Sequence, residues 1–210
     1  MLDLAGEKHI RSRIYRSWPV YVTDEAKKLP SLLQTARNVS GQWYQDENGW
    51  WFEYADGTYP SNTWEEIDYY WYFFDGSGYM VTGWVLSNNF GYYCETSAQA
   101  TAPQGSMITG WREIDNEWYF FETAGTEEQP LSSMITGWYS VYYFRKKDEG
   151  THPMGSMVTG AYTGIDDCYS PDLTYCFEED GEFSAVYADI IRRKQERSNW
   201  WWVASAEMIG

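Results

Sequence analysis

Aromatic side chains are the residues of this chain best suited to chemistry. Phe, Trp and Tyr make up 20% of the 210 residues, and Trp84, Trp111 and Trp138 each follow a Thr-Gly pair. The negative face of an aromatic ring attracts a cation, including one that cannot donate a hydrogen bond. Tryptophans at such regular places therefore predict open clefts for a cationic ligand. A plain hydrophobic core is the alternative use of the same rings.

The aromatic part of the chain is also its acidic part. Residues 41–183 hold 24 of the 31 acidic side chains and 4 of the 15 basic ones. Such a surface repels phosphate backbones and anionic lipid, because nucleic-acid binding depends on Lys and Arg. Nucleic acid is therefore excluded as a partner of this region, and a cation is favoured. A role of the charge in solubility alone is the alternative.

The sequence offers little for catalysis. His9 and His152 stand in polar stretches without the neighbours of a catalytic triad. Abundant carboxylates are typical of a solvated face, and a glycosidase pair among them is a minor alternative. We therefore predict a protein that is not an enzyme, with no catalytic residues and no cofactor.

The three cysteines do not have the spacing of a metal site, so no metal is predicted. A disulfide between Cys168 and Cys176 stays open, with Cys94 unpaired. There is no run of 18 apolar residues, so no membrane span is expected. The N-terminus lacks the apolar core of a secretory signal. Either the start of a parent protein is missing from this sequence, or export follows another route.

The positions of the tryptophans belong to a repeat. Met80, Met107, Met134 and Met157 each begin a Met-Val/Ile-Thr-Gly motif, at intervals of 27, 27 and 23 residues. Trp follows the motif in the first three copies, and Ala161 follows it in the last. A fixed period of this length indicates a repeat architecture built from one small supersecondary unit.

Each period reads as a β-hairpin. After Trp64, for example, a polar stretch leads to the aromatic run 71–74 and then to a turn with two glycines. Asn48-Gly49 and Asp56-Gly57 are further turn signals. The Thr-Gly glycine is expected where the backbone turns sharply into the next hairpin. Isolated hairpins are marginally stable, so neighbouring units must stack.

The predicted fold is all-β, a solenoid of stacked β-hairpin repeats with short irregular or helical flanks. We expect a partly irregular N-terminal flank at 1–40, the repeats at 41–183 and a C-terminal flank, possibly helical, at 184–210. Units starting near Trp43 and Ala161 look degenerate. Longer connections at 97–103, 126–130 and 146–153 are expected as exposed loops.

The segments 45–68 and 71–84 resemble the cell-wall-binding repeats of Gram-positive bacteria, including the choline-binding modules of pneumococcal-type surface proteins and lytic enzymes. Glucan-binding repeats of streptococcal glucosyltransferases and repeats of clostridial toxin tails share the pattern. The resemblance covers about residues 41–183. It implies ligand sites between consecutive hairpins, each a box of three aromatics that is often floored by a methionine.

Carried over to this sequence, the resemblance assigns two walls of each box to one hairpin. These pairs are Trp64 with Trp71, Trp84 with Tyr92, Trp111 with Trp118, and Trp138 with Tyr142. The third walls would be Tyr93, Tyr119 and Tyr143, and the floors would be Met80, Met107, Met134 and Met157. Phe74, Phe121 and Phe144 are expected in the core.

Two departures from the pattern limit the number of sites. Ala161 replaces the tryptophan of the last copy, and Trp138 is only four residues from Tyr142. The boxes of Trp64 with Trp71 and of Trp111 with Trp118 are therefore expected to work best. Inserted loops could cover some of the clefts.

The leading functional hypothesis is a non-catalytic module that attaches a bacterial surface or secreted protein to choline-bearing teichoic acid. Binding of a glucan or wall polysaccharide by the same clefts is the alternative, and a purely structural spacer is the third. The resemblance implies an extracellular location on the bacterial cell surface.

Overall fold

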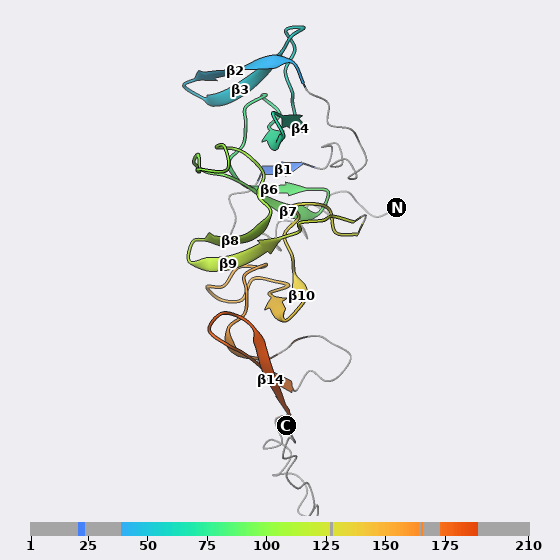
Figure 1. Cartoon of the computed structure of the whole chain (residues 1–210), viewed down its shortest axis with the longest axis vertical. Coiled ribbons are helices and arrows are strands. Elements are labelled where there is room, and N and C mark those ends of the chain that lie inside the picture. The colour runs from blue at the N-terminus through green and yellow to red at the C-terminus, as the bar shows by residue number, and fades with distance from the viewer. Residues whose placement is uncertain (1–20, 24–38, 127, 164, 166–172, 189–210) are drawn as a thin grey trace, which may run out of the picture. The chain divides into compact units, whose positions relative to one another are not determined.

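The structure is a computed structural model that describes residues 21–23, 39–126, 128–163, 165 and 173–188 (Figure 1). Its regular elements are all strands, which confirms the all-β prediction. In chain order they are β1 (Tyr21–Thr23), β2 (Gly41–Asp46), β3 (Gly49–Tyr54), β4 (Thr63–Ile67), β5 (Tyr70–Phe74), β6 (Gly83–Ser87), β7 (Phe90–Cys94), β8 (Gly110–Ile114), β9 (Glu117–Phe121), β10 (Gly137–Tyr139), β11 (Tyr142–Phe144), β12 (Gly160–Thr163), β13 (Leu173–Phe177) and β14 (Phe183–Ala188). They fall into two compact units, Met1–Met157 and Val158–Gly210.

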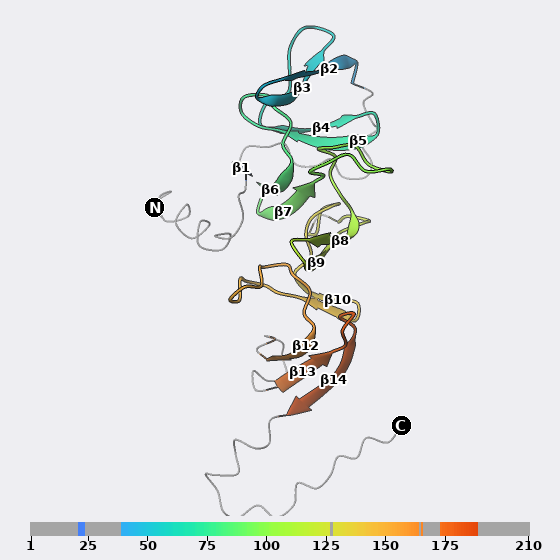
Figure 2. The same cartoon turned by 90° about the vertical axis from the view of Figure 1, so that its left-hand side faces the viewer.

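The first unit contains five antiparallel hairpins: β2–β3, β4–β5, β6–β7, β8–β9 and β10–β11. Figure 2 shows β4–β5 between the hairpins that precede and follow it. Three hairpins turn through two residues that both have positive φ, as in a type I′ turn. These pairs are Asp68-Tyr69, Asn88-Asn89 and Asp115-Asn116. Strand β1 adds to β6 in parallel, a pairing that the sequence did not indicate.

The repeated methionines join consecutive hairpins through their backbone. Each methionine forms a β-bridge with the last strand of its own hairpin, as Phe74 does with Met80. Its amide also donates to a carbonyl one hairpin earlier. The pairs are Met80 to Trp50 at 2.7 Å, Met107 to Trp71 at 2.8 Å, Met134 to Gly91 at 2.7 Å and Met157 to Trp118 at 2.7 Å. The four acceptors therefore occupy equivalent positions in successive hairpins.

The Thr-Gly glycines have the predicted left-handed backbone. Gly83, Gly110, Gly137 and Gly160 have φ of 82°, 73°, 78° and 69°. A side chain at such an angle is strained, so glycine is the residue that makes the turn from the methionine into the next hairpin at low energetic cost. The identical turn explains why the motif recurs.

The core lies between consecutive hairpins. Phe74, Cys94, Phe121 and Phe144 are equivalent residues of β5, β7, β9 and β11, and each is 0% exposed. This confirms the core position of the three phenylalanines. In one cluster, Trp64 and Phe73 of β4–β5 pack with Tyr92 and Cys94 of β7. Each hairpin is therefore stabilised by burial against its neighbour.

The second unit contains the three-stranded antiparallel sheet β12–β13–β14. The structure differs here from the helical flank considered for 184–210, because Phe183–Ala188 form strand β14. Val186 and Tyr187 favour a strand, and they pair with Tyr175 and Thr174 of β13. Residues 189–210, and most of 1–40, lie outside the described ranges. Cys94 and Cys176 are free, and Cys168 lies outside those ranges.

Candidate functional site: aromatic clefts between hairpins

Four opening tryptophans contact a ring of their own hairpin and a tyrosine of the next, namely Trp43, Trp64, Trp84 and Trp111. Trp64 lies with its ring centroid 5.1 Å from that of Phe73 and 5.2 Å from that of Tyr92. The corresponding distances are 5.1 Å for Trp84 to both Tyr93 and Tyr119. The interplanar angles of these contacts lie between 61° and 80°. The same edge-to-face arrangement thus recurs at each junction.

The structure changes which tyrosine belongs to which cleft. Successive residues of a strand point to opposite faces. Tyr93 therefore pairs with Trp84 across its own hairpin, while Tyr92 reaches back to Trp64. The sequence reading had placed Tyr92 beside Trp84 and Tyr93 in the box of the preceding hairpin.

The same exchange occurs at the fifth hairpin. Tyr143 pairs with Trp138 at 5.3 Å, and Tyr142 reaches Trp111 at 4.8 Å. Tyr119 contacts Trp84 of the hairpin before it, as expected for a third wall.

Each cleft lies between two consecutive hairpins and is numbered after the earlier of the two. The fourth cleft, between β8–β9 and β10–β11, is an open box of three rings. Trp111 and Trp118 come from β8 and β9, and Tyr142 comes from the next hairpin. Trp111 stands at 75° to Trp118 with centroids 6.3 Å apart, and at 78° to Tyr142. Trp111 is 40% exposed and Trp118 43% exposed. Two accessible tryptophan walls therefore meet at nearly a right angle.

The second cleft has the same parts but is closed. Trp64 is 3% exposed and Tyr92 2% exposed. Trp71 and Met107 are partly buried and pack against the cluster that these two residues form. As described, the rings of this cleft serve as core and leave little face for a ligand.

The first cleft was missed by the sequence reading. Trp43, Trp50, Tyr72 and Met80 line a cavity of about 360 Å³. The ring centroid of Trp43 lies 4.9 Å from that of Tyr72, at 66°. Burial, with smaller effects of Asp68 and Tyr70, raises the pKa of Tyr72 to about 12, so this wall is neutral at physiological pH. Three aromatic walls and a methionine thus enclose a cavity at the junction of β2–β3 and β4–β5.

A sequence signal for this cleft was present. Trp43 and Trp50 are seven residues apart, as are Trp64 and Trp71, and Trp111 and Trp118. The sequence analysis nevertheless treats the unit that starts near Trp43 as degenerate and assigns it no site. The residue seven positions after Trp84 is Gly91, so the third cleft lacks the second tryptophan wall.

The longer loops overhang clefts that lie earlier in the chain. Ala98, Pro103 and Gln104, which follow β7, line the cavity of the first cleft. Thr151 and Pro153, which follow β11, line a cavity at the third cleft. These two loops therefore supply polar or apolar contacts to a site two hairpins back.

The remaining predicted residues lie as follows. Trp84 is 6% exposed, Tyr119 2%, Tyr143 2%, Met134 5% and Met157 8%, so these side chains are buried. Met107 is partly buried. Trp138 is 41% exposed. Of the four methionines, Met80 is the one that lines the cavity of the first cleft.

The described part of the chain shows no cluster of three or more His, Cys, Asp or Glu side chains arranged to hold a metal ion. In the same residues there is no helix with the length and apolar character needed to cross a membrane. The chemistry offered by these clefts is aromatic and anionic.

Comparison with known proteins finds the repeat family that the sequence resembles. The model of the choline-binding repeat matches residues 62–101, and that of a putative cell wall binding repeat matches residues 109–126. A search of curated proteins found no match.

Two solved structures from Streptococcus pneumoniae are similar to this chain. CbpJ is 25% identical, with 69% of this chain and 42% of that chain covered, at a TM-score of 0.52. Choline binding protein F, solved in the presence of a peptidoglycan analogue, is 27% identical, with 68% and 40% covered, at a TM-score of 0.51. The chain thus spans less than half the length of either. The two matched segments contain strands β4 to β9, and they support an assignment of these hairpins to the choline-binding repeat family.

Proposed function

We propose that this chain is a non-catalytic wall-binding module that holds its protein on choline-bearing teichoic acid through the first and fourth clefts. The observation that carries the proposal is the open box of Trp111, Trp118 and Tyr142, with its nearly perpendicular walls. The first cleft supports it with the same three wall positions and a cavity of about 360 Å³.

The boxes suit a quaternary ammonium because it carries charge but no N–H donor. It must be held by ring faces rather than by hydrogen bonds, at about 0.5–1 kcal/mol per exposed ring and about 2 kcal/mol when desolvated. The acidic character of residues 41–183 attracts the same cation over a longer range. One cleft is consequently expected to bind weakly.

Attachment to a polymer would rest on the two clefts acting together. They belong to the same unit of the chain, and a teichoic acid that carries many cholines can engage both. The second contact is then intramolecular, so the combined affinity rises well above that of one site. The matches to choline-binding repeats and to choline binding protein F, which was solved in the presence of a peptidoglycan analogue, support a wall ligand for this arrangement.

The test is calorimetric titration of the chain with choline and, separately, with short glucans. Choline should bind at about two sites with millimolar affinity. Its binding should be lost in a double variant in which Trp50 and Trp118 are replaced by alanine. Heat from the glucan alone, abolished by the same double variant, would favour polysaccharide as the ligand. No heat and no change of melting temperature with tens of millimolar choline would refute the proposal.

A further inference from the structure

We propose that the third cleft, between β6–β7 and β8–β9, binds a primary ammonium group, such as that of an amino sugar or a lysine side chain. This site is separate from the choline boxes of the first and fourth clefts. It differs from them in shape and in the groups that line it.

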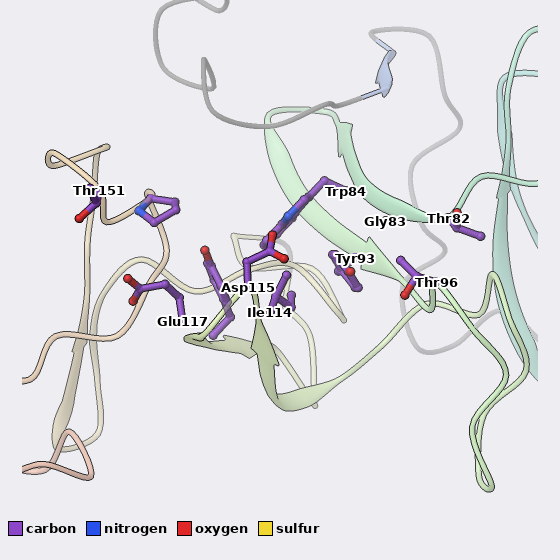
Figure 3. A pocket seen from close by; sticks show the side chains of 11 residues that line it. Thr82, Gly83, Trp84, Tyr93, Thr96, Ile114, Asp115, Glu117 and Thr151 are labelled. Carbon is purple, nitrogen blue, oxygen red and sulfur yellow. The ribbon is translucent and has the colours of Figure 1, made fainter.

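The third cleft contains a cavity of about 360 Å³. Trp84, Tyr93 and Tyr119 bring aromatic rings to it, and Asp115, Glu117 and Thr151 bring oxygen atoms (Figure 3). The rings come from β6, β7 and β9, and Thr151 comes from the loop after β11. The cavity is thus bounded by two hairpins and an overhanging loop.

The cavity lacks the wall that defines a choline box. Gly91 stands where Trp71 and Trp118 stand in the neighbouring hairpins, as the equivalent hydrogen bonds of their carbonyls show. Trp84 and Tyr119 are 6% and 2% exposed, so little of their ring faces is open. A quaternary ammonium would find too few ring faces to replace its hydration.

Carboxylates take the place of the missing ring. Asp115 is exposed at the turn between β8 and β9, and Glu117 is half-buried at the start of β9. Figure 3 shows the Asp115 carboxylate on the side of Trp84 and the Glu117 carboxylate on the side of Thr151. Burial, followed by the charges of Glu117 and Asp115, raises the pKa of Tyr119. Both charges therefore act on a ring that lines the cavity.

A nitrogen of the chain already uses one of these carboxylates. Nδ1 of His152 lies 2.6 Å from Oε1 of Glu117, and the histidine side chain is 50% exposed. Glu117 thus already has a nitrogen partner at the edge of the cavity. An incoming amine would compete with His152 for it.

A primary ammonium fits this set of groups better than choline does. Its three N–H donors suit the carboxylate and hydroxyl acceptors that line the cavity, because N–H donors of a cation form charge-assisted hydrogen bonds with such oxygens. The carbon chain or sugar ring attached to it can rest against Tyr93, which is partly exposed. The quaternary nitrogen of choline has no N–H to donate to the carboxylates, and a neutral sugar makes no use of their charge.

The experiment titrates the full chain with D-galactosamine, with Nα-acetyl-lysine methylamide and with choline. At least one of the two primary amines should bind the wild-type chain. The amine that binds more tightly shows whether the ammonium group comes from an amino sugar or from a lysine side chain. Glu117→Gln should lower the affinity for that amine at least tenfold and leave the affinity for choline unchanged. Trp118→Ala should lower the affinity for choline and leave the affinity for the amine unchanged. His152→Ala should tighten the amine a fewfold by removing the competitor.

Asp115→Asn provides a second variant that preserves the fold, because Asn suits the positive φ at that position. This variant should also lower the affinity for the amine. The proposal is overturned if neither amine binds to the wild-type or His152→Ala chain, if both carboxylate variants bind as tightly as the wild type, or if Trp118→Ala removes the amine. Failure of choline to bind, with the amine still bound, would count against the choline boxes alone.

Discussion

The rings of Trp111 and Tyr142 come from consecutive hairpins and stand at 78°, with centroids 4.8 Å apart. The contact of Trp64 with Tyr92 has nearly the same geometry, 5.2 Å and 62°. Trp111 is nevertheless 40% exposed and Trp64 only 3%. The step from one hairpin to the next therefore sets the ring geometry, and the surrounding packing decides whether the cleft is open to a ligand.

The difference between an open and a closed cleft can be measured at Trp118 and Trp71, whose carbonyls accept equivalent hydrogen bonds. Trp118→Ala removes one wall of the open box and should abolish choline binding at that cleft, because too few ring faces remain. Trp71→Ala in the closed cleft should leave choline affinity unchanged and lower stability, because the Trp71 ring packs on the core. Calorimetry with thermal melting separates the two effects.

The matched pair guards against a trivial result. If both variants lost choline to the same degree at equal foldedness, exposure would not decide which clefts bind. If neither variant lost choline affinity, the ligand would bind elsewhere.

The first cleft predicts a second, independent site. Trp50→Ala should remove one choline from the stoichiometry and leave the affinity of the other site unchanged. The double variant with Trp118→Ala should lose both, with additive changes in binding free energy, because the two residues share no described contact. Titration followed by tryptophan fluorescence reports each site. Strong non-additivity would indicate a single shared site instead.

The hairpin architecture could be predicted from local signals. The Met-Val/Ile-Thr-Gly motif marks a turn at positive φ, and the spacing of the motifs shows the length of a unit. The box walls were harder to assign. Tyr92 and Tyr93 are identical in type, and only strand register decides which of them faces Trp64. A shift by one residue sends a side chain to the other face.

Exposure could not be predicted from the sequence. The pair Trp64 and Trp71 has the same spacing as Trp111 and Trp118, but its cleft is closed by packing that no local pattern records. The overhang of Pro103 and Gln104 above Trp43 likewise depends on contacts across some 60 residues. Strand β14 was difficult for another reason, since Ala and Ile in 184–193 suit helices as well as strands.

Stability should fall as the solution becomes alkaline. Burial raises the pKa of the Cys94 thiol from about 9 to about 12, against a smaller opposing effect of the Phe73 backbone. Burial also raises the pKa of Tyr72 from 10.0 to about 12. Above pH 9 the unfolded chain releases protons that the folded chain keeps, so the free energy of unfolding decreases with pH. Well below pH 8 these groups are protonated in both states, so they do not change the free energy of unfolding with pH.

Urea denaturation at pH 8, 9.5 and 11 checks this expectation. The midpoint should fall steadily over that range, and Cys94→Ala should show a smaller fall between pH 8 and 9.5 than the wild type. A midpoint independent of pH up to 11 would contradict the burial of these groups.

The position two residues before each repeated methionine offers a stabilising substitution. Gly105 and Gly155 precede Met107 and Met157 with φ of 81° and 82°, whereas Ser132 precedes Met134 with φ of 61°. Ser132 is 0% exposed, and its hydroxyl has no hydrogen-bond partner among the described residues. Ser132→Gly relieves the left-handed strain and removes a buried polar group, so it should raise stability by about 1 kcal/mol.

The converse change at Gly105 should be strongly destabilising. A Cβ there would overlap the sulfur of Met80 as well as strain the backbone. Gly57→Ala is the matched control, because Gly57 has a φ of 83° and nothing within 4 Å of the added Cβ. Denaturant unfolding should give a loss of about 1 kcal/mol for Gly57→Ala, from strain alone, and a loss at least twice as large for Gly105→Ala. Equal losses would mean that Met80 moves aside without cost, and the hairpin junction would then be less tightly packed than its geometry indicates.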